Sequence, residues 1–273
     1  MGIEGSRLYD AVHDFMNRDF SKDVNEINRL IRQNKNISAN LRSDIPPIPF
    51  SGDPWTKAKG NCVLSIGINP RAHNPGDNQY EKEIRASIEL VKSHLNGGQS
   101  ALRKYIDSRR EYFHTVKYGA HFTFLENRYK EYWYSGEDVW QKRIQSMDII
   151  PYFSNNAVAI SNDSYVTQFN EHLALLDYRN IIEEMVDLIE PNWIHLNGVL
   201  PCDVFESAYA SESYTMRGLD EKKGVCFGNC IIGNWEIPVL SHNFINYPSN
   251  SPAKIDDWKI IFPNWEDWLS AQQ

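Results

Sequence analysis

Three polar side chains of this sequence stand beside short apolar stretches, at positions where they could take part in chemistry. Asn69 and His242 each follow such a stretch, and Asp148 lies inside one. An amide can orient a water molecule but is a poor base, an ionised carboxylate only accepts hydrogen bonds, and an imidazole can both donate and accept them. These groups could hold a water molecule and recognise the polar edge of a ligand, provided that the fold positions them.

Short apolar stretches alternate with amphipathic ones, which predicts strands that alternate with helices. We expect strands at 61–66, 146–151, 193–196, 231–233 and 237–240, and helices at 6–35, 80–145, 177–189 and around 204–205. This order predicts a three-layer α/β/α sandwich with a central, mostly parallel sheet, in which ligands bind at the carboxyl ends of the strands. We expect a single domain over 1–273, with an N-terminal helical segment (about 1–44) and a helical insertion (about 80–145).

The composition is that of a folded globular protein, with 41% hydrophobic and 12% aromatic residues among 273. No stretch has the apolar length of a membrane span, and the first residues lack the pattern of a signal peptide, so we expect a cytoplasmic protein without membrane association. The net charge of −8 argues against coating of nucleic acid but allows a local basic face. The densest basic run is either a solvated helix face or a phosphate-contacting one, and it comprises Arg103, Lys104, Arg109, Arg110 and Lys117.

The four cysteines do not suggest a metal site. Cys62 lies in an apolar stretch, and Cys226 and Cys230 have no second Cys or His pair nearby that would complete four zinc ligands. We expect reduced structural thiols, no metal and no cofactor.

Three motifs at strand ends, taken together, resemble the uracil-DNA glycosylase superfamily. Gly67-Ile68-Asn69-Pro70 is similar to the Gly-x-Asn-Pro loop of its mismatch-specific and single-strand-selective branches. Asp148-Ile149-Ile150-Pro151 is placed like the strand end that reads the flipped base, and Tyr247-Pro248-Ser249-Asn250-Ser251 resembles the x-Pro-Ser-x-x loop. The segment 189–198 resembles the family's helix, proline, strand and glycine segment. The resemblance covers roughly residues 45–260 and omits 80–140.

The resemblance implies an enzyme that flips a nucleotide out of DNA and hydrolyses its N-glycosidic bond. Asn69 would position the attacking water, and the alternative is an Asn that only turns the chain before Pro70. The base would lie against Gly67, Ile68, Arg71, Phe122, Asp148 and Phe153. The DNA backbone would be held by Pro248, Ser249, Asn250 and Ser251.

Asp148 departs from the family pattern, which usually has Asn at this position. A carboxylate pairs naturally with the amino group of cytosine, and a carboxyl group could also support cytosine that is protonated on its ring nitrogen. The sequence therefore predicts a cytosine-type target. The alternative is that Asp148 is a surface or helix-capping residue.

Unmodified cytosine cannot be the intended target, because its removal would destroy the host genome, so the base should carry a modification. Some branches have a bulky Tyr after the loop proline, where this sequence has Arg71 and then Ala72. Arg71 could bind a polar substituent on the base or a phosphate. The aromatic residues of the insertion either wall an enlarged pocket or form ordinary core, and they include Tyr112, Phe113, His121, Phe122, Tyr132, Trp133 and Tyr134.

Tyr247 stands where many relatives have a His that stabilises the leaving base, and His242 could substitute for it or be structural. We therefore expect a monofunctional, monomeric DNA glycosylase for a modified cytosine, with a role in defence against phages that carry modified DNA. The alternatives are a repair glycosylase for uracil or oxidised pyrimidines, and an inert relative that binds DNA or a protein.

Overall fold

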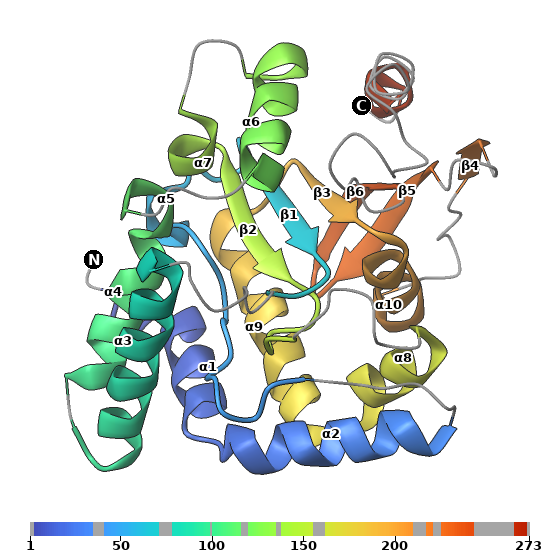
Figure 1. Ribbon diagram of the computed structural model, residues 1–273. Coiled ribbons are helices and arrows are strands. Elements are labelled where there is room, and N and C mark those ends of the chain that lie inside the picture. The colour runs from blue at the N-terminus through green and yellow to red at the C-terminus, as the bar shows by residue number, and fades with distance from the viewer. Residues whose placement is uncertain are drawn as a thin grey trace. The chain divides into compact units, whose positions relative to one another are not determined.

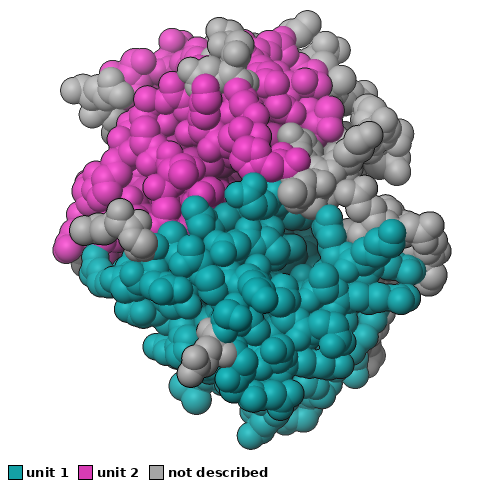
Figure 2. Space-filling model, turned by 90° about the vertical axis from the view of Figure 1, so that its left-hand side faces the viewer, with its two compact units in different colours: residues 1–51, 68–112, 147–185 teal, residues 52–67, 113–146, 186–273 magenta. Residues whose placement is uncertain are grey.

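The computed structural model describes residues 3–34, 41–70, 78–98, 100–115, 120–134, 138–154, 162–209, 217–220, 225–242 and 265–271. The chain divides into two compact units, each made of three segments (Figure 2). Unit 1 comprises residues 1–51, 68–112 and 147–185, and unit 2 comprises residues 52–67, 113–146 and 186–273. The segments of the two units alternate along the chain, and each unit is described separately below.

Unit 1 is mainly helical. Its helices are α1 (Arg7–Met16), α2 (Phe20–Asn34), α3 (Asn78–Leu95), α4 (Ala101–Arg110), α8 (Asn162–Glu171) and most of α9 (Leu173–Ile189). α3 packs on α4, and α2 packs on α8 (Figure 1). The Ser6 hydroxyl caps α1 by accepting a hydrogen bond from the Tyr9 N–H at 3.2 Å. Within the predicted N-terminal helical segment (about 1–44), residues 7–34 thus contain two helices.

The sheet has six strands in the order β2-β1-β3-β6-β5-β4 (Figure 1). The strands are β1 (Val63–Gly67), β2 (Ile144–Asp148), β3 (Trp193–Asn197), β4 (Arg217–Asp220), β5 (Val225–Ile232) and β6 (Trp235–His242). β1 pairs in parallel with β3, and β3 pairs in parallel with β6. All of β3 and all of β1 except its last residue are buried, as expected for parallel strands that are covered on both faces.

The last two predicted strands form an antiparallel hairpin. Ile232 pairs with Trp235, so only Gly233 and Asn234 connect β5 to β6. A parallel connection needs a crossover of a dozen or more residues, so a two-residue loop dictates antiparallel pairing. Gly233 has φ 59°, a conformation that such tight turns require and that glycine adopts at little cost. β4 pairs with β5 in antiparallel fashion, and this strand was not predicted.

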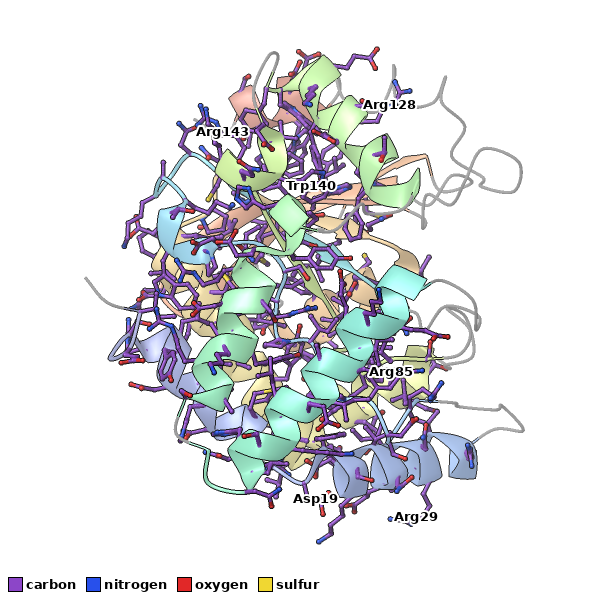
Figure 3. The ribbon with its side chains drawn as sticks, turned by 60° about the vertical axis from the view of Figure 1, so that its left-hand side comes forward. Asp19, Arg29, Arg85, Arg128, Trp140 and Arg143 are labelled. Carbon is purple, nitrogen blue, oxygen red and sulfur yellow. The ribbon has the colours of Figure 1, made fainter. Side chains whose placement is uncertain are left out.

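The helices of unit 2 include α6 (Ala120–Tyr132), α7 (Val139–Lys142) and α10 (Val199–Tyr209), and α5 (Tyr112–Thr115) lies in it apart from its first residue. α10 packs against β3, β5 and β6, and α6 packs against α7. A 3-10 turn over Pro54–Thr56 precedes β1. Trp140 of α7 is fully buried, whereas Arg143 just after α7 lies at the periphery (Figure 3). The described part of the predicted insertion over about 80–145 is mostly helical, and it supplies helices to both units.

The α/β class expected from the sequence, with helices around a mostly parallel central sheet, is confirmed by the element order and the strand pairing. The second strand begins and ends earlier than predicted, at Ile144 and Asp148, so that Ile149 to Pro151 follow the strand. Among the helices in the described ranges, none has both the length and the apolar character to cross a membrane.

Candidate functional site

Asn69 lies in the loop after β1, and its side chain is held by the segment that follows β2. Its Nδ2 donates to Ser154 Oγ at 2.6 Å and to the Pro70 carbonyl at 3.1 Å. Because a carbonyl can only accept, the amide atom that faces Pro70 must be the NH2 group. The amide oxygen Oδ1 is thereby turned away from both partners, as an acceptor that could hold a water molecule.

Main-chain hydrogen bonds reinforce this arrangement within unit 1. Ile150 N–H donates to the Ile68 carbonyl at 2.9 Å, and Ser154 N–H donates to the Pro70 carbonyl at 3.1 Å. The loop 68–70 and the segment 150–154 therefore form one hydrogen-bonded assembly. Asn69 is thus fixed in orientation by its neighbours, which agrees with a positioning role but also with a purely structural turn.

Asp148 is the last residue of β2 and has an unusual acidity. Burial of its carboxyl raises the pKa to about 7, because the protein around it cannot solvate the charge as water does. No lysine or arginine of the described ranges contributes to this pKa. The carboxyl is therefore close to half protonated at neutral pH, and its neutral form can both donate and accept a hydrogen bond.

Two buried tyrosines fix the main chain at this strand end. Tyr178 donates from its hydroxyl to the Asp148 carbonyl at 2.6 Å, and Tyr165 donates to the Ile149 carbonyl at 3.0 Å. These bonds satisfy carbonyls at the point where β2 ends. The main chain that carries the Asp148 side chain is therefore held by Tyr165 and Tyr178, and no motif of the sequence pointed to these two residues.

An aromatic ring of the insertion lies close to Asp148. Burial raises the pKa of the Tyr112 hydroxyl to about 12, and the charges of Glu83 and Asp148 add to this rise. The Arg109 guanidinium lies over the rings of Tyr105 and Tyr112, at 5.7 and 5.5 Å from their centres. Tyr112 therefore lies near the Asp148 carboxyl. This agrees with the alternative in which aromatic residues of the insertion wall an enlarged pocket.

The other base-contacting candidates have different surroundings. Gly67 and Ile68 are half-buried at the end of β1, and Phe153 is buried in the segment after β2. Phe122, on α6 in unit 2, packs edge-on against Phe113 and Trp140, at 5.5 and 5.2 Å between ring centres. Phe122 therefore belongs to an aromatic cluster of unit 2, and its contact with a base stays a prediction.

His242, at the end of β6, belongs to a buried polar chain in unit 2. Its Nε2 lies 2.5 Å from Nε2 of His195 on β3. Nδ1 of His195 meets the Tyr129 hydroxyl, which in turn bonds to Ser65 Oγ at 3.2 Å. All four side chains are at most 4% exposed. Nε2 of His242 is thus occupied by His195, so it is not available to a leaving base.

These four side chains can direct their mutual hydrogen bonds in two ways. In one, Ser65 donates to Tyr129, Tyr129 donates to His195, and His195 donates to His242. In the other, His242 donates to His195, His195 donates to Tyr129, and Tyr129 donates to Ser65. The sequence carried a signal for this chain, because Ser65 and His195 are polar residues in the middle of buried strands and must find partners.

The basic run is largely neutralised by acids of its own unit. Arg103 pairs with Asp107 and Glu4, at 3.0 and 3.2 Å, and Arg110 pairs with Asp107 at 3.0 Å. Arg109 is buried against the two tyrosines rather than exposed on the helix surface. These contacts favour the structural alternative over a phosphate-contacting face for these three residues, while Lys117 lies outside the described residues.

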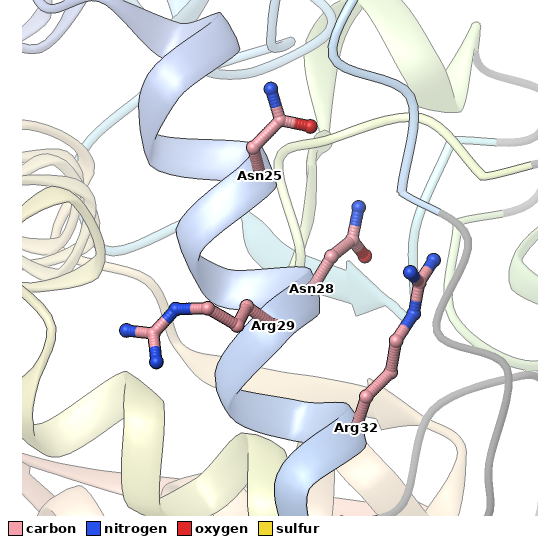
Figure 4. A pocket seen from close by; sticks show the side chains of 4 residues that line it. All are labelled: Asn25, Asn28, Arg29 and Arg32. Atoms are coloured by element: carbon pink, nitrogen blue, oxygen red, sulfur yellow. The ribbon is translucent and has the colours of Figure 1, made fainter.

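Several predicted site residues lie outside the described ranges, namely Arg71, Tyr247, Pro248, Ser249, Asn250 and Ser251. Two surface hollows of unit 1 are lined by residues other than the candidate ones. One of them lies along α2 and is lined by Asn25, Asn28, Arg29 and Arg32 (Figure 4). Among the described residues, no group of His, Cys, Asp and Glu is arranged to hold a metal ion.

No protein-family model matches this chain, and a search of curated proteins found no match either.

Proposed function

We propose that this protein is a DNA glycosylase that flips a modified cytosine-type base out of DNA and hydrolyses its N-glycosidic bond, leaving an abasic site. The observation that carries the proposal is the Asp148 carboxyl at the end of β2, whose pKa burial raises to about 7. Asn69, in the same unit, is fixed with its amide oxygen turned away from its partners.

The proton on Asp148 suits a cytosine edge. Cytosine presents an amino donor beside an acceptor ring nitrogen, and a neutral carboxyl accepts from the first while it donates to the second. Transfer of this proton to the ring nitrogen would let the base leave as a neutral molecule instead of an anion. General acid assistance of this kind contributes roughly 10²- to 10⁴-fold to enzyme rates.

Asn69 would meet the second requirement of the reaction, which is a water molecule held near the anomeric carbon. Its NH2 group is committed to Ser154 and Pro70, so Oδ1 would accept a hydrogen bond from the water and orient a lone pair. An amide removes no proton efficiently, and this suits a reaction in which bond breaking runs ahead of attack.

The test is an excision assay on single- and double-stranded oligonucleotides, each with one plain cytosine, hydroxymethylated or glucosylated cytosine, or uracil. Abasic sites are cleaved with alkali, and the released base is identified by mass spectrometry. We expect release of a modified cytosine at least about 100-fold faster than of plain cytosine, and loss of release with Asn69→Ala. Absence of release from every substrate would reject the glycosylase and favour an inert relative.

A repair glycosylase for uracil or oxidised pyrimidines is the second candidate, and the same carboxyl favours it. A neutral carboxyl can donate to the ring carbonyl of uracil and accept from its ring N–H, as the family's amide does. Fastest release of uracil in the assay would select this candidate. If modified cytosine is preferred, defence against phages with modified DNA is the role we propose, and protection of host cells from such phages should require Asn69.

A further inference from the structure

A hollow opens on the surface of unit 1 where α2, α8 and the start of α9 meet, and its volume is about 660 Å³. Figure 1 shows α2 and α8 side by side, and the two helices pack on each other. The volume is typical of small-molecule sites, which measure about 300 to 1,000 Å³. Neither Asn69 nor Asp148 lines the hollow, so a ligand bound there is separate from the proposed glycosylase chemistry.

Gln168 of α8 is a buried polar residue of this hollow whose amide lacks a partner. It lines the hollow and is 8% exposed, so more than nine-tenths of it is buried. Its main-chain carbonyl accepts from the His172 N–H at 2.8 Å, but within the described ranges its side-chain amide makes no hydrogen bond. Buried amides normally have partners. A ligand with an N–H donor would supply the missing partner of Oε1.

Arg18 also lines the hollow, but its charge is already paired. Its Nε and Nη2 donate to the two carboxylate oxygens of Asp23 at 2.8 and 2.9 Å. Its Nη1 donates to Asp177 Oδ2 at 2.8 Å. The guanidinium is therefore shared between two carboxylates, and it does not make the hollow attractive to an anion.

The remaining charges leave the hollow acidic. Asp19, Glu26 and Glu171 line it. Apart from Arg18, the one lysine or arginine among the lining residues that the structure describes is Lys22. Three carboxylates thus face one ammonium group, and opposite charges attract each other even near a protein surface. The hollow therefore favours a cationic ligand over a neutral or an anionic one.

Glu26 keeps its acceptor oxygens for such a ligand. Nδ1 of His172 accepts from the Ala174 N–H at 3.2 Å, so the neutral ring carries its proton on Nε2. This Nε2 lies 3.7 Å from Glu26 Oε2, and Arg29 Nη2 lies 3.8 Å from Glu26 Oε1. Both distances exceed those of hydrogen bonds. An ammonium group in the hollow could therefore approach Glu26 more closely than either neighbour does.

Two leucines give the hollow an apolar part. Leu30 of α2 and Leu173, the first residue of α9, line it, and Leu173 is 68% exposed. An alkyl chain that covers an exposed leucine removes apolar surface from water, which favours binding. A ligand that has a methylene chain as well as positive charge therefore matches the hollow better than an inorganic cation does.

We propose that this hollow binds a linear aliphatic polyamine. Its ammonium groups pair with Glu26 and Glu171 and donate to Gln168 Oε1, while its methylene chain covers Leu173. A metal ion gains nothing from the leucines, and an uncharged chain gains nothing from the carboxylates. The three features of the hollow are thus used together by a polyamine alone among these ligands.

The test is isothermal titration calorimetry of the full-length protein with spermidine at low salt, where charge interactions are least screened. We expect saturable binding of one spermidine per chain. Octanediol, an uncharged chain of similar length, and magnesium chloride should each bind at least about 10-fold more weakly. Absence of saturable spermidine binding, or binding of the diol or of Mg²⁺ with equal or higher affinity, would overturn the proposal.

Substitutions locate the binding. Glu171→Lys reverses one charge in the hollow, and Glu89→Lys makes the same change in net charge at an exposed position of α3 outside it. We expect Glu171→Lys to bind spermidine about 10-fold more weakly, and Glu89→Lys to bind it like the unsubstituted protein. Equal affinities of these two variants would mean that spermidine follows the overall charge, and the proposal would fail.

Gln168→Leu tests the amide separately, because it keeps a side chain of similar size and removes the hydrogen bond to a charged group. It should weaken spermidine binding about 10-fold, and circular dichroism checks that the variant is folded. A folded Gln168→Leu variant with undiminished affinity would refute the role of this amide and the proposal with it.

Discussion

Asp148 is a carboxylic acid that folding keeps near the balance between its neutral and ionised forms. Its pKa rises from 3.8 to about 7 because burial disfavours the charge. A residue of this kind can read a base and can also supply a proton, which a permanently ionised carboxylate or an amide cannot do equally well. The same property affects both the proposed chemistry and the stability of the fold, and the two consequences can be measured separately.

Asp148→Asn should abolish excision of the cytosine-type base, because an amide has no proton to transfer to the ring nitrogen. We expect a rate loss of roughly 100-fold or more and a shift of preference towards uracil. Excision by the unsubstituted protein should fall as the pH rises above about 7, where Asp148 loses its proton, and any residual activity of the variant should lack this fall. Unchanged base preference in the variant would remove the argument for cytosine.

The same substitution should change how stability depends on pH. The folded state binds the Asp148 proton more tightly than the unfolded state, so its contribution to stability is complete below about pH 4 and is lost as the pH rises to about 7. Asn is neutral throughout, so the stability advantage of Asp148→Asn should grow by ~2.5 kcal/mol between pH 5 and pH 8. Denaturant unfolding at both pH values measures it, and a difference independent of pH would contradict the raised pKa.

Ser154 is the residue that fixes the orientation of Asn69. Ser154→Ala removes the 2.6 Å acceptor and leaves the amide held only by Pro70, so the side chain gains freedom to rotate. We expect the excision rate to fall about 10-fold with little change in DNA affinity, because misplacement of a positioning group affects the reacting geometry most. Ser164→Ala, at another buried serine of unit 1, is the control and should retain full activity. Equal rates in the two variants would assign Ser154 no part in positioning.

At the scale of elements, β1, β3 and β6 are joined by more than their main-chain pairing. Ser65, His195 and His242 come from these three strands, and Tyr129 of α6 completes the buried chain. Such a chain rigidifies the sheet only while every member is satisfied, because a buried polar atom without a partner is costly. The strands and the helix therefore depend on one another through a few polar atoms.

Tyr129→Phe should destabilise the protein by about 1 to 3 kcal/mol, the usual cost of a buried polar group left without its partner, here Nδ1 of His195. Ser65→Ala should cost less, because Tyr129 retains its bond to His195. Denaturant unfolding of the two variants compares them at equal conditions. A Tyr129→Phe variant as stable as the unsubstituted protein would mean that this chain adds nothing to the fold.

Much of the architecture followed from the sequence, and the exceptions have physical causes. Apolar runs bounded by Gly and Pro predicted β1, β3 and α9, because burial patterns are local. Side-chain partners are not local, which is why the bond of Asn69 to Ser154 could not be anticipated. The acidity of Asp148 was equally hidden, since it depends on how the surrounding residues exclude water.

At the scale of the whole molecule, the two units are built from interleaved segments, and this has a consequence for folding. Each unit draws on three parts of the chain, so no single cut yields a fragment that contains one complete unit and nothing else. A fragment of residues 1–112 lacks 147–185 of unit 1, and a fragment of residues 113–273 lacks 52–67 of unit 2, including β1.

We therefore expect that neither fragment unfolds cooperatively when it is produced alone, because each is missing strands or helices that would cover its apolar surfaces. Urea titrations followed by circular dichroism and tryptophan fluorescence measure this, with the full chain as the control that should unfold in coincident transitions. Mixing the fragments should restore a cooperative transition, because each fragment contains the segments that the other one lacks. A sharp transition in residues 113–273 alone would show that β1 is dispensable for cooperative unfolding. The sheet, in which β1 lies between β2 and β3, would then have to form without this strand.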